Sequence, residues 1–242
     1  TIDVGFLVQK GVKVKSVTQL GADEIFNFDN SALHDRPPLL IDAILDEDLR
    51  VKVMVLHMRS LNGIEEERVQ RKRLAQALSV AQMVQDIQRK KNVKLVVLGD
   101  FNAFEFTDGY VDVAGIIKGD FNPADSLVCS IASCPDIVKQ DLTNQVLNID
   151  PNERYSFIFR DRFNEAGSRG DAQVLDHAMT SRKLSKFVTD LQFARGNADA
   201  ATALGDDDGT EGDLALRASD HDGLVLYLCK DDDDCDDDDD DD

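Results

Sequence analysis

The chain has 242 residues, 42% of them hydrophobic, and carries a formal net charge of −20. This length and composition are typical of one large globular α/β domain with a sizeable core, and they exclude a disordered chain. No run of about 18 apolar residues is present, so we expect no membrane-spanning segment. The acidic balance also argues against a non-catalytic module that holds nucleic acid by charge alone.

The C-terminus explains much of the negative charge. Residues 231–234 and 236–242 are all aspartate, and the rest of the chain is still acidic without them. We predict a folded domain over residues 1–230 and a disordered, solvated tail over 231–242, because like charges repel one another. Weak Ca²⁺ binding by the tail is the alternative, but the Gly and Asn of Asp-rich calcium repeats are missing from it.

The four cysteines form two close pairs in the sequence. Cys129 and Cys134 are one pair, and Cys229 and Cys235 are the other. Two short disulfide loops in an exported protein fit this spacing, and four free thiols in a cytosolic protein are the alternative.

The hydrophobic pattern predicts many short strands and one long helix. Two strand pairs come first, at 2–8 with 12–18 and at 39–45 with 51–57. A helix over 64–90 follows, with one apolar stripe made by Leu74, Leu78, Ala81, Val84 and Ile87.

Shorter elements follow this helix along the chain. We expect strands at 94–98, 155–159, 174–179, 187–193 and 224–228, a short helix within 107–117, a helical turn at 182–186, and loops over 119–152 and 196–212. This order predicts a mixed sheet system flanked by helices.

Polar residues follow three of the apolar strands. The strand at 94–98 ends in Gly99-Asp100-Phe101-Asn102, so a carboxylate and an amide leave it on the same side. Such a pair can hold a hard cation or a phosphate oxygen, although a simple Gly-Asp turn would look the same. Leu175-Asp176-His177 and Ser219-Asp220-His221 also adjoin apolar strands, and His57 ends another.

These motifs, in this order, resemble the endonuclease/exonuclease/phosphatase superfamily, which includes pancreatic-type deoxyribonuclease. The resemblance covers residues 1–228 and is closest to the bacterial extracellular nucleases, as in residues 99–109 and 173–177. It implies a four-layer α/β sandwich, with two packed mixed β-sheets flanked by helices. It also implies a secreted, monomeric, metal-dependent phosphodiesterase that cleaves DNA and does not act at a membrane.

The resemblance also implies catalytic roles for individual residues. His221 would be the general base and Asp176 would orient its imidazole. Asp100 would orient the attacking water or help hold the metal, and Asn102 would contact the scissile phosphate. His57 would protonate the leaving oxygen or stabilise the transition state.

The implied binding residues complete the site. Asp220, together with Asp100 and Asn102, would bind the metal, and oxygen ligands favour Mg²⁺, Mn²⁺ or Ca²⁺. Arg36 would contact a phosphate, with a plain surface charge as the alternative.

Two departures from the family pattern bear on activity. The family's usual first strands, with an Asn and then a metal-binding Glu, have no counterpart before Thr1, so the chain is expected to lack its N-terminal strands. Asp222-Gly223 follows Ser-Asp-His where the family often has a proline. An enzyme of the same fold that acts on a lipid or inositol head group, possible RNA cleavage, and a truncated inactive homologue therefore remain open alternatives.

Overall fold

The computed structural model describes residues 3–45, 49–129, 134–159, 170–200 and 217–229, and the fold below refers to these ranges. A six-stranded mixed sheet forms its centre, in the order β1-β4-β5-β6-β10-β7. Its strands are β1 (Lys13–Gln19), β4 (Leu39–Ile44), β5 (Arg50–His57), β6 (Leu95–Asp100), β10 (Asp176–Thr180) and β7 (Thr143–Asn144).

Strand direction determines which residues meet at each end of this sheet. β5 and β6 are parallel, whereas β10 is antiparallel to β6. The last residues of β5 and β6 therefore lie beside the first residue of β10. Polar residues that are far apart in the sequence are brought together at this end of the sheet.

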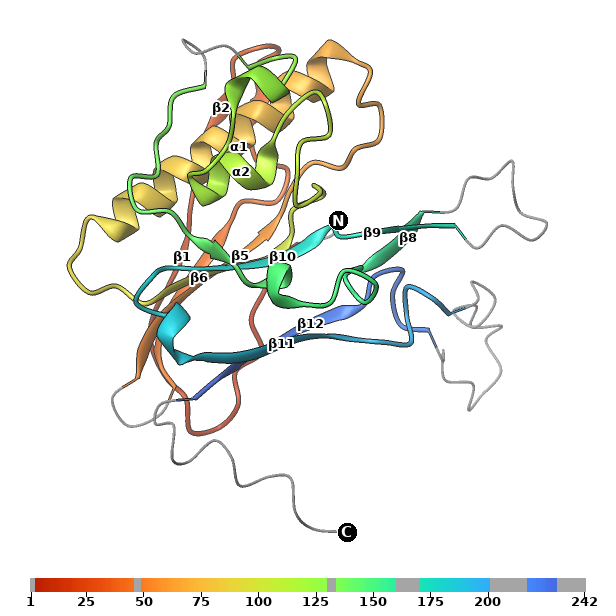
Figure 1. Cartoon of the computed structure of the whole chain (residues 1–242). Helices are drawn as coiled ribbons and strands as arrows, with labels where there is room; N and C mark the ends of the chain where they lie inside the picture. Colours follow the sequence, from red (N-terminus) through yellow and green to blue (C-terminus); the bar gives the residue numbers. More distant parts are fainter. Residues whose placement is uncertain (1–2, 46–48, 130–133, 160–169, 201–216, 230–242) are drawn as a thin grey trace, which may run out of the picture.

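Two helices cover one face of the sheet. Figure 1 shows α1 (Glu67–Gln88) and the short α2 (Val113–Lys118) on this side. Asp112 caps α2 by accepting a hydrogen bond from the Gly115 backbone N–H at 2.8 Å, as is typical at a helix N-terminus. Alternate sheet residues such as Leu95 and Val97 pack against the helices in one buried core.

A small antiparallel sheet covers the opposite face (Figure 1). It consists of β11 (Val188–Ala194) and β12 (Gly223–Leu228). Val51, Val96 and Ala178 point to this side and form a second core with Leu191 and other apolar residues. The predicted α/β class is confirmed. Within the described ranges the second sheet has these two strands, and both α-helices lie on the other side of the large sheet.

Short elements connect these layers. They are β2 (Ile25–Phe26), β3 (Ser31–Ala32), β8 (Phe157–Phe159), β9 (Asp171–Gln173) and three 3₁₀ turns, at Pro123–Asp125, Gln145–Asn148 and Ser185–Phe187. The disulfide Cys129–Cys134 is present as expected, whereas the partner expected for Cys229 lies outside the described residues. None of the described helices is long and apolar enough to cross a membrane.

The first predicted hairpin is wrong. Residues 3–8 form no strand, and Leu7 is fully exposed. The turn at Lys10-Gly11 does form, but β1 pairs with β4 instead, from Lys13 opposite Ile44 to Gln19 opposite Leu39. Alternating hydrophobicity cannot identify the partner of a strand, and here β4 is the partner.

The helix was predicted correctly, but its buried face is rotated from the predicted stripe. Val69, Arg73, Ala77, Val80 and Val84 are its buried side, while Leu74 and Leu78 are only partly buried. The sequence pattern does not suggest a buried arginine, because arginine is rarely buried without partners.

Candidate active site

Three of the predicted site residues lie in one row across neighbouring strands. His57, the last residue of β5, is in register with Asp100, the last residue of β6. Asp100 is in turn in register with Asp176, the first residue of β10. Adjacent strands lie about 4.8 Å apart, so the sheet itself brings an imidazole and two carboxylates together.

Gly99 allows β5 and β6 to approach each other in this way. Its φ is +122°, a conformation that residues with a side chain rarely adopt. A Cβ atom at this position would lie 2.3 Å from the backbone oxygen of Leu56. The glycine immediately before Asp100 is therefore a structural requirement of the site.

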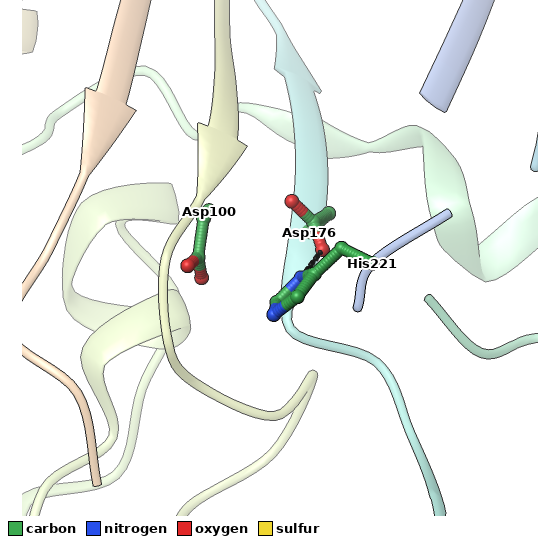
Figure 2. A group of neighbouring side chains, drawn as sticks. All are labelled: Asp100, Asp176 and His221. Atoms are coloured by element: carbon green, nitrogen blue, oxygen red, sulfur yellow. Dashed lines mark hydrogen bonds and ion pairs between the residues drawn. The ribbon is translucent and has the colours of Figure 1, made fainter. Parts of the chain in front are cut away.

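His221 completes the cluster from the segment before β12. Its Nδ1 lies 2.6 Å from Oδ2 of Asp176, as the dashed line in Figure 2 marks. Burial lowers the pKa of His221, but the hydrogen bond and charge of Asp176, with the charge of Asp100, raise it above its ordinary value overall. The bond to Nδ1 leaves Nε2 as the ring nitrogen available for proton transfer.

The two carboxylates lie close enough to repel each other. Burial, followed by the negative charge of Asp176, raises the pKa of Asp100 to about 6. One oxygen each of Asp100 and Asp176 and one nitrogen of His221 lie within 4.8 Å of one another. This donor set fits a hard divalent cation, which would relieve the repulsion between the carboxylates.

His57 contacts the other side of Asp100. Its Nε2 lies 3.3 Å from Oδ2 of Asp100. Burial, and then the positive charge of Arg36, lower the pKa of His57, so its neutral form is favoured near neutral pH. Arg36 donates long hydrogen bonds of 3.4 Å to the backbone oxygens of His57 and Met58. The predicted phosphate-contacting arginine thus lies at the site and carries positive charge there.

Asn102 is held tightly beside Asp100. Its backbone N–H and its side-chain Nδ2 each donate to the Asp100 carboxylate at 2.7 Å. Nδ2 also donates to the backbone oxygen of Met58 at 3.2 Å. Both side-chain N–H groups are therefore engaged, and in this structure Asn102 orients Asp100. The predicted contact with a phosphate would require one of these bonds to open.

Asp220 is the one predicted metal ligand that stands apart. Its carboxylate is exposed and is not part of the three-residue cluster. It lies close enough to raise the pKa of His57 and of His221 by its charge, although other effects are larger. Its position beside His221 follows from its place in the sequence.

A cleft of about 980 Å³ opens at His221 and Asn102. Residues 60–65 form part of its wall, and Phe104, Phe157 and Phe159 add aromatic surface. The ring of Phe157 lies 4.9 Å from the imidazole of His221, measured between centroids. The cleft therefore offers apolar surface directly beside the polar cluster.

Sequence reasoning missed two buried residues that support the site. Arg73 of α1 donates to the backbone oxygen of Asn102 at 2.8 Å and pairs with Asp108 at 2.9 Å. His177 Nε2 lies 2.8 Å from the backbone oxygen of Ala103. Burial lowers the pKa of His177 to about 4, so it is neutral and structural. A basic residue on the buried side of an amphipathic helix could have indicated Arg73.

Comparisons with known proteins extend these observations. No family model matches the sequence, and no curated protein matches it either. Solved structures do match. An AP endonuclease from Archaeoglobus fulgidus superposes with a TM-score of 0.52 at 18% identity, over 89% of this chain and 71% of that one.

Two further structures give similar values. The 3′ phosphatase NExo from Neisseria, bound to a product DNA hairpin, has a TM-score of 0.51 at 14% identity, over 89% of this chain and 71% of that one. A family protein from Bacteroides thetaiotaomicron has a TM-score of 0.50 at 14% identity, over 90% and 63%. At these identities the likeness concerns the fold. The chain has the fold of the endonuclease/exonuclease/phosphatase superfamily.

Proposed function

We propose that this protein is a divalent-metal-dependent phosphodiester hydrolase that cleaves nucleic acid, with DNA as the preferred substrate. The observation that carries the proposal is the 2.6 Å bond between His221 and Asp176, directly beside Asp100. An imidazole oriented by a carboxylate is the arrangement that general-base catalysis needs.

His221 takes the proton of the attacking water in this proposal. Asp176 accepts the Nδ1–H of the imidazole, so Nε2 presents its lone pair to the water and Asp176 stabilises the imidazolium that forms. Arg36 supplies positive charge near the phosphate oxygens, where negative charge grows in the transition state. His57 lies on the leaving-group side of Asp100.

Asp100 and Asp176 would hold the metal, with Asp220 nearby. A bound Mg²⁺, Mn²⁺ or Ca²⁺ supplies positive charge for the phosphate and lowers the pKa of a water. The body of the protein is acidic, so a cation at this position also reduces the repulsion between the site and a polyanionic substrate. Asn102 keeps the Asp100 carboxylate in place.

Nucleic acid is favoured over a lipid head group by two observations. The cleft beside His221 carries aromatic rings, on which bases can stack. Two of the structures with this fold are an AP endonuclease and a phosphatase bound to a DNA hairpin. We further propose a catalytic unit of residues 1–230, a monomer, and secretion from a bacterium, in line with the Cys129–Cys134 disulfide.

A plasmid-nicking assay tests the proposal. The chain is expected to convert supercoiled DNA to the nicked form with Mg²⁺ and to stop when a chelator is added. His221→Ala should reduce the rate by at least about 10³-fold. His34→Gln is the matched control, because His34 is a buried histidine on the helix side, bonded to Ser79.

The outcomes separate the remaining alternatives. Full activity of His221→Ala would reject the assigned base. Hydrolysis of a phospholipid or inositol phosphate without cleavage of DNA or RNA would assign the fold to another substrate. No hydrolysis of any of these, in a folded protein with Mg²⁺, would identify an inactive homologue.

A further inference from the structure

A basic pocket lies at the opposite end of the sheet from the candidate active site. It has a volume of about 640 Å³, and six cationic side chains line it with no acidic one among the lining residues. These six residues, here called the basic pocket, are Arg89, Lys90, Lys91, Arg182, Lys183 and Lys186. In a chain with net charge −20, such a concentration of positive charge calls for an anionic partner.

Two segments that are far apart in the sequence build the pocket. One follows α1 and the other follows β10. They are joined where the Ser181 backbone N–H donates to the Leu95 oxygen at 2.8 Å and the Leu95 N–H donates to Ser181 Oγ at 3.0 Å. Leu95 begins β6 and Asp100 ends it, so the pocket lies about 17 Å from the active site along this strand.

Most of these cations have no carboxylate partner in the described part of the chain. Arg89 pairs with Asp86 at 2.9 Å, whereas the other five side chains make no ion pair there. All six side chains are exposed. Like charges held this close repel one another, and an anion bound between them removes that repulsion.

The aspartate segment 231–242 leaves the fold beside this pocket. The Cys229 backbone N–H donates to the Phe187 oxygen at 2.8 Å, and Phe187 directly follows Lys186. Lys94 lies over the Phe187 ring at 5.0 Å. An extended chain spans about 3.3–3.6 Å per residue, so twelve residues reach up to about 40 Å, which is enough to cross the pocket.

We propose that the aspartate segment 231–242 binds the basic pocket of the same chain and keeps other polyanions out of it. Eleven carboxylates face six cations across a short link, and a tethered ligand has an effective concentration in the millimolar range. The contact is electrostatic and exposed, so salt weakens it. This inference is independent of the proposed hydrolase activity.

Zero-length cross-linking tests the contact in the full chain. A carbodiimide joins a carboxylate to an amine only when the two touch. At low salt, the monomer should carry the segment 231–242 linked to Lys183, Lys186, Lys90 or Lys91, with the yield falling in about 0.5 M salt. Equal yields at the exposed Lys10 and Lys15 would overturn the proposal. Links found only in covalent dimers would also overturn it, because the segment would then serve a second copy.

Binding of a labelled polyphosphate tests the consequence. A full-length variant with the eleven aspartates replaced by serine should bind it about tenfold more tightly than the natural chain. Lys183→Glu with Lys186→Glu in that variant should remove the gain. Arg68→Glu with Arg71→Glu, an equal charge change in the first turns of α1, should keep it.

Two results would overturn this consequence. If the gain survives reversal of the pocket charges, the segment acts only through net charge. If the natural chain binds polyphosphate at the pocket as tightly as the serine variant, the pocket is open to external polyanions such as nucleic acid.

Discussion

Replacing Arg73 with methionine should destabilise the fold and displace the catalytic loop. The guanidinium is 1% exposed, and Nη1 donates to the backbone oxygens of Arg59 at 2.6 Å and Asn102 at 2.8 Å. Nη2 pairs with Asp108, whose side chain is 4% exposed. Arg73→Met leaves a buried carboxylate and two buried acceptors without this donor, which costs about 3–5 kcal/mol of unfolding free energy.

A second variant separates stability from positioning. In Arg73→Met with Asp108→Asn the uncompensated charge is gone, while the new amide oxygen can still accept the Tyr110 and Val111 N–H groups that Asp108 accepts. Denaturant unfolding should show a recovery of about 1–3 kcal/mol. DNA cleavage should stay about 10²-fold below wild type, because Asn102 has lost its anchor. Wild-type cleavage in the double variant, or a loss below about 1 kcal/mol in Arg73→Met, would refute this reasoning.

Two further predictions concern stability. Gly99→Ala should lower the unfolding free energy by more than about 2 kcal/mol in denaturant titration, because the added Cβ would meet the Leu56 oxygen; an unchanged midpoint would contradict the close approach. Hydrogen bonds from Arg50 and Lys52 lower the pKa of Asp42 to about 2, below its value in the unfolded chain. The stability that this carboxylate adds is therefore present above pH 4 and lost as the pH falls from 4 to 2. The stability difference between wild type and Asp42→Asn should shrink over that range by about 1 kcal/mol, and a constant difference would contradict the assignment.

The sequence predicts the parts of this fold that depend on local pattern. The helix over 64–90, the strands that end at His57 and Asp100, and the Cys129–Cys134 disulfide were all expected and are all present. Each depends on periodicity or short spacing, which one segment reveals by itself. The failed pairing of 2–8 with 12–18 depended on a choice of partner strand, which only tertiary contacts decide.

The candidate site divides in the same way. Motifs at strand ends identify Asp100, Asp176 and His221, and the register of β5, β6 and β10 explains why their side chains meet. Arg73 and the internal bonding of Asn102 could not be foreseen, because they depend on how α1 packs against the loop after β6. Buried polar partners are set by packing and leave little trace in hydrophobic patterns.

The central claim is that Asp176, His221 and Asp100 act together as one hydrolytic site. The most direct test is the single-turnover rate of DNA cleavage by Asp176→Asn at saturating Mg²⁺. This change keeps the side chain's shape but removes the charge that orients and stabilises the imidazole of His221. We predict a loss of about 10³–10⁴-fold with unchanged folding. A rate within about threefold of wild type would contradict the claim, because the proton would then move without this pair.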